Sequence, residues 1–136
     1  MIARFSIYTK SKVELQDITL RIKEIVASSG VREGVCYVFV PHTTAGVIVN
    51  ENADPDVGRD ILGQLERMVP AQSNYYHREG NAPAHIKASL VGSSQMLLVD
   101  DERLVLGTWQ GIFLCEFDGP RQRTILVEVL SGGGLP

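Results

Sequence analysis

The chain has 136 residues, of which 44% are hydrophobic and 21% are charged, and this balance is typical of a single globular domain over residues 1–136. Its net charge of −3 argues against a nucleic-acid partner, because no stripe of lysine and arginine is present to neutralise phosphates. No apolar run approaches the length of a membrane span, and the N-terminus lacks the apolar core of a signal peptide. We therefore expect a cytoplasmic protein with no membrane contact, in which Cys36 and Cys115 are buried thiols rather than a disulfide.

Strands and one helix are expected in the first third of the chain. Residues 4–10 predict a first strand, and apolar residues recur at helical spacing within 13–30, which predicts a helix that stops at its last glycine. Residues 34–40 are rich in β-branched and aromatic side chains, and Pro41 ends this predicted strand. The run 45–51 predicts the next strand, so the residues between the two strands form a turn.

The segment 54–70 predicts a second helix. Pro55 suits its first turn, and Asp54 and Asp56 suit the positive end of the helix dipole. Four apolar residues lie on one stripe and predict a helix that faces the core: Val57, Ile61, Leu65 and Met68. The polar segment 71–84 follows without apolar period, and we expect a long functional loop there.

Strands joined by short turns are expected after Ser94. The predicted runs are 95–100, 104–117 and 123–130. Strands joined by short turns pair antiparallel, because a parallel pair needs a long crossover. The order of elements therefore predicts an α+β fold with a mainly antiparallel sheet system and two main helices. Residues 131–136 are expected to be a frayed tail.

Three histidines lie in turn or loop contexts beside small residues, namely His42, His77 and His85. Neutral imidazole is the commonest protein ligand for zinc, and three such ligands with one open position are typical of catalytic zinc. Their spacing matches no short metal motif, so histidines that only make structural hydrogen bonds stay an alternative.

Lys87 is the candidate cation for an anionic ligand. If a short helix begins near His85, its amide donors and Lys87 could hold a phosphate or a carboxylate. Hydroxyl groups at Thr43, Thr44 and Ser89 lie in the same segments, although such hydroxyls often only satisfy local backbone groups.

Two further positions each have a structural and a functional interpretation. Glu51 lies at the end of a β run, where a solvated charge is the simpler interpretation and a general acid/base or fourth metal ligand is the functional one. Trp109 and Gln110 lie between Gly107 and Gly111, which suggests a close approach of the backbone. Packing is the simpler role for the tryptophan, and stacking on an aromatic substrate is the alternative.

Three long segments together resemble the YjbQ family, also called UPF0047 or the secondary thiamine-phosphate synthase family: HTTAGVIVNENADPDV, YYHREGNAPAHIKASLVGSS and GTWQGIFLCEFDGPRQRTI. The resemblance covers essentially the whole chain apart from the glycine-rich tail. It implies a two-sheet β-sandwich with two helices, assembled as a homotrimer around a threefold axis. It also implies one pocket for a metal or an anion, built from the segments that carry His42, His77 and His85.

The resemblance implies an activity as well. Family members are associated with a weak thiamine-phosphate-synthase-like reaction, which joins a hydroxyethylthiazole phosphate to a pyrimidine diphosphate and releases pyrophosphate. A cation would stabilise the leaving diphosphate in such a transfer. This chain has no obvious paired-aspartate motif for diphosphate and magnesium, and Ala53 stands where many relatives carry a cysteine. A catalytic thiol at that position is therefore excluded here.

The leading hypothesis is a metal-assisted enzyme that acts on a small phosphorylated or anionic molecule. The three histidines would hold a divalent cation, with zinc the first candidate, and Glu51 and Lys87 would be the catalytic side chains. The anion or substrate contacts would come from Thr43, Thr44, Asn81, Lys87, Ser89, Trp109 and Gln110. The alternatives are a non-catalytic trimer that binds a metal or metabolite, and a structural domain without a ligand.

Overall fold

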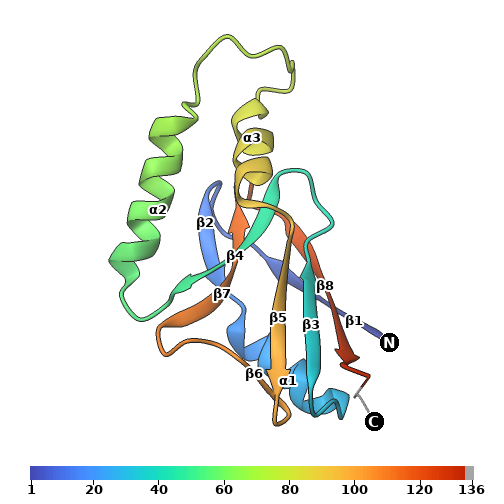
Figure 1. Cartoon of the computed structure of the whole chain (residues 1–136). Helices are drawn as coiled ribbons and strands as arrows, with labels where there is room; N and C mark the ends of the chain where they lie inside the picture. The colour runs from blue at the N-terminus through green and yellow to red at the C-terminus, as the bar shows by residue number, and fades with distance from the viewer. Residues whose placement is uncertain (134–136) are drawn as a thin grey trace.

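Two antiparallel sheets and three helices make up residues 1–133, the part of the chain that the computed structural model describes (Figure 1). The five-stranded sheet has the order β1 (Ile2–Tyr8), β8 (Gln122–Ser131), β3 (Gly34–Phe39), β5 (Ser94–Asp100) and β6 (Arg103–Leu104). The three-stranded sheet has the order β2 (Glu14–Asp17), β7 (Gln110–Glu116) and β4 (Ala45–Glu51). The helices are α1 (Thr19–Ser29), α2 (Pro55–Met68) and α3 (Ala82–Val91). The predicted α+β class and the antiparallel pairing are confirmed. Two main helices were predicted, whereas residues 1–133 contain three.

The main core lies between the two sheets and under α1. Alternate side chains of β3, such as Cys36 and Val38, point inward and pack with Ile22 and Val26 of α1. Cys36 and Cys115 are both buried and form no disulfide, as expected. Burial disfavours the thiolate and raises the pKa of Cys36 to about 11 and that of Cys115 to about 12. Both thiols are therefore unreactive packing residues.

The first predicted helix begins later than the periodicity indicates. Glu14–Asp17 forms strand β2 because it pairs with β7, and tertiary pairing overrides the local apolar spacing. The helix starts at Thr19, whose backbone N–H donates to Asp17 Oδ1 at 2.9 Å. It ends at Gly30, which takes the left-handed conformation with φ of 75°.

Helix α2 has the predicted start but not the predicted packing. Asp54 caps it by accepting a hydrogen bond from the N–H of Asp56 at 2.9 Å, and Pro55 occupies the first turn. No α2 residue is fully buried, and the apolar stripe of α2 is not part of the main core. The helix instead contacts a second, smaller cluster on the outer side of the three-stranded sheet, partly through Leu62 and Leu65.

Helix α3 occupies part of the segment predicted to be a loop. Its apolar residues are spread around the helix, with Ala84 and Ala88 buried and Leu90 exposed, so the sequence shows no helical period. Small side chains let α3 approach β4 closely, and a Cβ added at Gly46 would lie only 2.5 Å from a methyl carbon of Val91. The connection before α3 is correspondingly shorter than predicted.

Two predicted boundaries after β5 also change. The run 104–117 is not one strand, because the backbone turns at Gly107, whose N–H donates to the Gln110 side chain at 2.8 Å. Strand β8 continues to Ser131, so the predicted tail begins later, and its residues 134–136 lie outside the described part of the chain. None of the helices between residues 1 and 133 is long and apolar enough to cross a lipid bilayer.

Candidate functional site

A cavity of about 290 Å³ lies between α3, the end of α2 and the chain just before β2; we name it the α3 cavity. It is lined by Lys12, Val13, Glu66, Ala71, Gln72, Gly80, Asn81, Pro83, Ala84, Lys87 and Phe117. Two sequence-predicted residues, Asn81 and Lys87, therefore meet in one cavity. Lys12 and Glu66 were not predicted, since they come from segments distant in the sequence and carry no motif.

Lys87 is almost completely buried in the wall of the α3 cavity. Its side chain is 4% exposed, forms an ion pair with Glu66 of α2 and has its ammonium 5.9 Å from the ring centroid of Phe117. A buried ammonium is tolerated only when a partner compensates its charge. With Lys12 the cavity contains two cations and one carboxylate, which is a net positive charge suited to an anion.

Asn81 precedes the first turn of α3 and reduces the number of free backbone N–H groups at that helix end. Its backbone oxygen accepts from the N–H groups of Ala84 at 3.0 Å and of His85 at 3.4 Å, and Pro83 has no N–H. Few amide donors are therefore free for an anion at this end, in contrast to the prediction from the sequence. The Asn81 side chain donates to Asp118 at 2.9 Å, so the cations supply the electrostatic attraction in the cavity.

His77 and His85 lie next to each other near the start of α3. Their ring centroids are 5.0 Å apart, and the rings meet edge to face at 82°. A carboxylate oxygen of Glu79 lies 3.8 Å from Nε2 of His77, whose side chain is 44% exposed. The structure thus brings together two of the three predicted metal ligands, and neither of them is among the residues that line the α3 cavity.

His42 makes a different contact. Its Nε2 accepts a hydrogen bond from the backbone N–H of Thr124 at 2.9 Å, which occupies the lone pair that would bind a metal. Burial and then the nearby Arg123 lower the pKa of His42. Within residues 1–133, no three histidine, cysteine, aspartate or glutamate side chains are grouped so that they could hold a metal ion.

Glu51, Trp109 and Gln110 lie at the far end of β4 and β7. Glu51 is paired with Gln110 across the sheet, and its carboxylate accepts from the N–H of Asp54 at 3.2 Å, beside the start of α2. Strand β4 has seven residues and begins directly after Thr44, so about 20 Å separates its ends. Within one chain, β4 therefore separates these three residues from the turn that carries His42. In Figure 1, α2 begins near the end of β4 that lies away from the start of α3.

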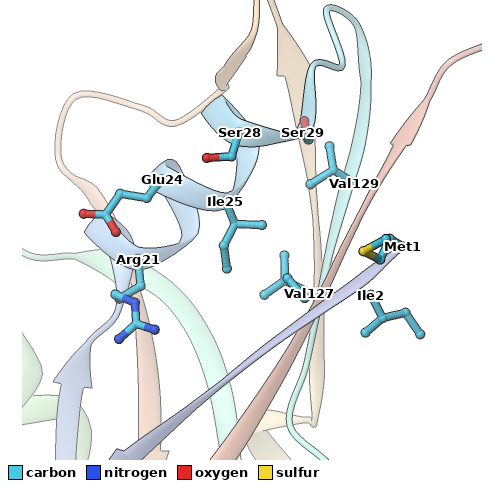
Figure 2. A pocket seen from close by; sticks show the side chains of 10 residues that line it. Met1, Ile2, Arg21, Glu24, Ile25, Ser28, Ser29, Val127 and Val129 are labelled. Carbon is cyan, nitrogen blue, oxygen red and sulfur yellow. The ribbon is translucent and has the colours of Figure 1, made fainter.

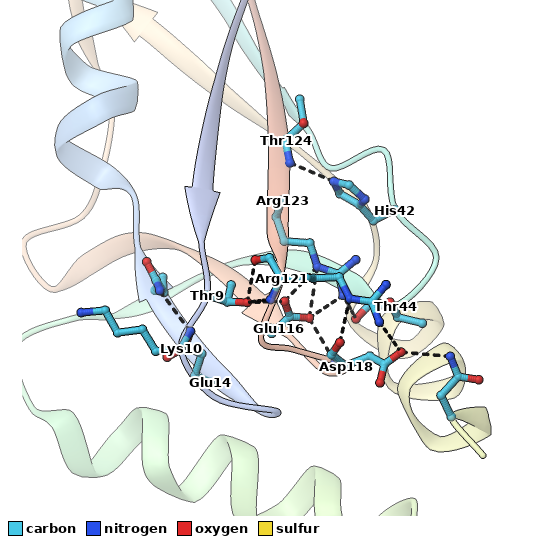
Figure 3. A network of polar contacts seen from close by, with 12 residues as sticks. Thr9, Lys10, Glu14, His42, Thr44, Glu116, Asp118, Arg121, Arg123 and Thr124 are labelled. Carbon is cyan, nitrogen blue, oxygen red and sulfur yellow. Dashed lines mark hydrogen bonds and ion pairs between the residues drawn. The ribbon is translucent and has the colours of Figure 1, made fainter. Parts of the chain in front are cut away.

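The remaining predicted hydroxyls differ in exposure. Thr43 and Ser89 are exposed, and the Ser89 hydroxyl donates to the backbone oxygen of His85 at 2.9 Å. Thr44 is 4% exposed and is part of a buried polar network (Figure 3). This network joins the turn after β3 to the ends of β7 and β8.

The centre of the network is an ion pair between Arg123 and Glu116, which are 2% and 0% exposed. Arg123 also donates to the backbone oxygen and the hydroxyl of Thr44, at 3.1 and 2.8 Å. Burial alone would raise the pKa of Glu116, but hydrogen bonds from Arg123, from the Thr9 hydroxyl and from a backbone N–H outweigh it and lower that pKa. The sequence does indicate the burial of Arg123. It lies two residues before the inward-facing Ile125, and residues two apart on a strand point to the same side of the sheet.

Comparison with known proteins shows which family the chain is related to. A sequence profile described as UPF0047 protein YjbQ-like matches residues 3–132. The chain belongs to the YjbQ-like UPF0047 family. Its relative MJ1081 of Methanocaldococcus jannaschii is 48% identical over 131 residues, which cover 96% of this chain and 95% of the relative. YugU of Bacillus subtilis is 44% identical, with 96% of this chain and 100% of YugU covered.

Solved YjbQ-like structures share the fold. A YjbQ/UPF0047 protein from Clostridium acetobutylicum is 51% identical, with a TM-score of 0.93 and coverage of 94% of this chain and 99% of that chain. A YbjQ-like protein from Sulfolobus solfataricus is 36% identical, with a TM-score of 0.93 and 96% of both chains covered. These names state a family and no reaction.

A larger groove of about 620 Å³ lies elsewhere on this YjbQ-like chain, between α1 and the strands β1 and β8 (Figure 2). Its floor is aliphatic, with Ile25, Val127 and Val129, and Arg21 and Glu24 lie at its rim. None of the sequence-predicted site residues lines it. The α3 cavity is smaller but contains the convergent polar groups expected of a ligand site.

Proposed function

We propose that this YjbQ-like protein is an enzyme that acts on a small phosphorylated or otherwise anionic molecule, bound in the α3 cavity. The observation that carries the proposal is the convergence of Lys12 and Lys87 on that cavity. A volume of about 290 Å³ is near the lower limit of ligand pockets, about 300 Å³. It suits a small molecule or the phosphorylated end of a larger one.

Lys87 is the residue we expect to bind the anion most strongly. Its ammonium is held by Glu66, whose side chain is 48% exposed. An anionic ligand competes with Glu66 for Lys87, and the released carboxylate can be solvated at little cost. A charge-assisted hydrogen bond to a largely buried ammonium is stronger than one at the open surface. His77 and His85, which lie near the start of the same helix, are our candidates to move a proton, since imidazole is the commonest general acid–base.

We also propose that His77 and His85 hold a divalent cation, with zinc the first candidate. Two neighbouring imidazoles can supply two ligands, and oxygens of the bound molecule or water would complete the coordination. Bound there, the cation would stabilise charge on a departing phosphate or diphosphate, which a thiamine-phosphate-synthase-like transfer requires. His42 is not part of this pair, because Thr124 already occupies its Nε2.

We propose further that the protein is a cytoplasmic homotrimer. Large apolar side chains on the outer face of the five-stranded sheet are 43% to 57% exposed; this outer-sheet patch consists of Tyr37, Phe39, Met96, Leu98 and Leu130. Such a contiguous patch is typical of a protein interface. A threefold ring joins two different surfaces of the chain, so the Glu51 end of one copy could meet the histidine end of the next and supply the acid/base.

A non-catalytic metal- or metabolite-binding trimer is the second candidate function. The position of Glu51, at the opposite end of β4 from the histidines, favours it. Glu51→Gln separates the two functions. The enzyme hypothesis expects loss of turnover on phosphorylated substrates with unchanged ligand affinity, whereas the binding hypothesis expects no turnover in either protein.

Calorimetric titration with inorganic phosphate and pyrophosphate tests the anion site. Lys87→Met keeps the length and apolar stem of the side chain and should weaken binding at least tenfold, whereas Glu66→Gln should leave it equal or tighter because the competing carboxylate is gone. Lys23→Met, at an exposed position of α1, is the matched control. Wild-type affinity in Lys87→Met would reject the α3 cavity as the anion site.

Metal analysis of the purified protein and thermal unfolding with added zinc test the cation site. A cation that binds only the native state at a hundred times its Kd stabilises it by about 2.7 kcal/mol. His77→Ala and His85→Ala should each remove that stabilisation, and His42→Ala should retain it. A wild-type protein without metal and without a zinc-dependent Tm contradicts the cation proposal and leaves the anion proposal standing.

A further inference from the structure

Strand β1 is an edge of the five-stranded sheet, and within residues 1–133 it pairs with β8 on one side alone. The N–H of Thr9 donates to the backbone oxygen of Arg121 at 2.9 Å, in the register of the two strands. Ser6 faces Thr124, whose N–H points the other way, to His42. Residues of an antiparallel pair that bond to each other alternate with residues that do not. The backbone N–H and C=O groups that point away from β8 are therefore those of Ile2, Arg4, Ser6 and Tyr8.

This side of β1, which we name the free edge, is open to solvent. Arg4 and Ser6 are both exposed, and their backbone N–H and C=O groups have no hydrogen-bond partner within residues 1–133. Gln16 reaches the far end of the strand, where its Nε2 lies 3.5 Å from the backbone oxygen of Tyr8. A row of unpaired N–H and C=O groups at every second residue has the spacing of an extended backbone. It is therefore a template for one further strand.

The other sheet edges in the described part of the chain are short or covered. Strand β6 has two residues and β2 has four. Strand β4 has seven residues, as β1 has, but the N–H of Val47 donates to the backbone oxygen of Gly92 at 3.1 Å. The backbone oxygen of Val47 accepts from the Gln95 side chain, also at 3.1 Å. Natural sheets use such devices to protect their edges, and among the four edges in residues 1–133 the free edge lacks them.

The two faces of β1 beside the free edge define the chemistry of an added strand. Its inner face borders the groove of about 620 Å³, whose lining includes Ala3 and Ile25 (Figure 2), so side chains on that face should be aliphatic. Its outer face carries Arg4, which forms no ion pair within residues 1–133 and lies opposite Leu126 of β8. Glu128 is diagonal to Arg4, at about 7–8 Å between Cβ atoms, whereas a carboxylate directly opposite on an added strand would be at about 5 Å.

We propose that the free edge is a docking site for an extended segment of another protein, which adds a strand to the five-stranded sheet. Aliphatic side chains of this segment face the groove, and a carboxylate lies opposite Arg4. A second copy of this chain fits less well. Antiparallel self-pairing over the whole strand, centred on Phe5, would place the Arg4 side chains of the two copies diagonally across from each other, and a charge on an edge strand disfavours such pairing. The inference is independent of the α3 cavity.

Amide hydrogen exchange followed by NMR tests whether the edge is free in the wild-type protein. The N–H groups of Arg4 and Ser6 should exchange at least about tenfold faster than those of Phe5 and Ile7, which bond to β8. Equal protection of all four would mean that a second copy already occupies the edge, and this result overturns the inference.

Docking is measured by fluorescence anisotropy with a labelled nine-residue peptide in which valine and glutamate alternate. The wild type should bind this peptide, and should bind a peptide of alternating valine and lysine several-fold more weakly. Ser6→Pro removes an outward N–H without breaking a bond to β8 and should weaken binding at least tenfold. Ser6→Ala keeps the N–H and is the matched control. Equal affinities of these two variants overturn the inference.

Arg4→Glu gives a test that does not depend on how Ser6→Pro folds. The exposed side chain of Arg4 forms no ion pair within the described chain, so the variant should fold as the wild type does. It should reverse the preference and bind the valine–lysine peptide several-fold more tightly than the valine–glutamate peptide. An unchanged preference contradicts the role of Arg4, and a wild type that binds neither peptide contradicts the docking site.

Discussion

At the scale of single residues, one buried ion pair stabilises the ends of β7 and β8 and the turn after β3. The Arg123–Glu116 pair is enclosed by protein, and each partner is stable there only because the other is present. Its hydrogen bonds extend to Thr44 and Thr9, from three different strand ends or turns. The pair therefore stabilises the end of the molecule where His42 lies.

Arg123→Met should destabilise the fold by about 3–5 kcal/mol, because it leaves the Glu116 carboxylate buried without a cation. Arg121→Met is the matched control, since Arg121 pairs with Asp118 but its side chain is 51% exposed. That change should cost less than about 1 kcal/mol. Urea unfolding of the three proteins measures both values, and equal losses would contradict the structural role of the buried pair.

The stability of the fold should depend on Glu116 at acidic pH. Its pKa in the folded protein is lowered from 4.5, so the unfolded chain binds the proton more readily. The stabilisation is therefore complete above 4.5 and is lost as the pH falls through the folded value. Unfolding free energies measured from neutral to acidic pH should fall more steeply in the wild type than in Glu116→Gln. Parallel curves would mean that Glu116 does not titrate in this range.

Sequence reasoning selected two residues that line the α3 cavity but not their partners. Lys87 and Asn81 could be selected because a polar segment with histidines surrounds them, and both do line the α3 cavity. Glu66 could not be selected, since on α2 it resembles any solvated helix charge and only the tertiary fold brings it to Lys87. Arg123 alternates with inward-facing residues, which indicates burial but does not indicate its partner.

At the scale of elements, the two helices outside the sandwich differ in how tightly they are attached. Helix α3 contacts β4 through small residues, and the N–H of Val47 donates to the backbone oxygen of Gly92 at 3.1 Å. Helix α2 has no buried residue and is tied to α3 through Glu66 and Lys87. Figure 1 shows α2 at the side of the molecule, beyond α3. The sequence predicted the well-capped α2 but indicated α3 only as a possible short helix near His85, because α3 packs by small side chains instead of an apolar stripe.

Gly46→Ala tests the close approach of α3. Its Cβ would lie 2.5 Å from a Val91 methyl carbon and 2.6 Å from the backbone oxygen of Gly92, and a backbone atom cannot move aside alone. Overpacking of this kind costs about 1–3 kcal/mol. Gly63→Ala is the control, because its Cβ finds only an Arg67 nitrogen at 3.6 Å, and it should stabilise α2 by about 0.5–1 kcal/mol. Chemical denaturation of both variants would show opposite signs, and a neutral Gly46→Ala would count against tight packing.

At the scale of the whole molecule, two predicted groups of site residues lie at opposite ends of the sandwich. The motifs that carry them are close in the sequence, since only β4 separates Thr44 from Glu51. A strand is extended, so neighbours in sequence on its two sides are far apart in space. The sequence pattern thus predicted the α+β fold, whereas the proposed sharing of a site between copies depends on assembly, which no single-chain pattern contains.

Assembly can be tested on the outer-sheet patch. Met96 lies opposite Tyr37 in the register of β3 and β5, and its side chain is 57% exposed. Met96→Lys places a charge within the patch, and desolvating that charge should disfavour any interface there. The wild type should have three times the chain mass of 14.9 kDa in size-exclusion chromatography with light scattering, and Met96→Lys should have that mass once. Leu20→Lys, at an exposed position of α1 that is 72% accessible, should stay trimeric. A monomeric wild type would contradict the proposed trimer and the proposal that a neighbouring copy supplies Glu51.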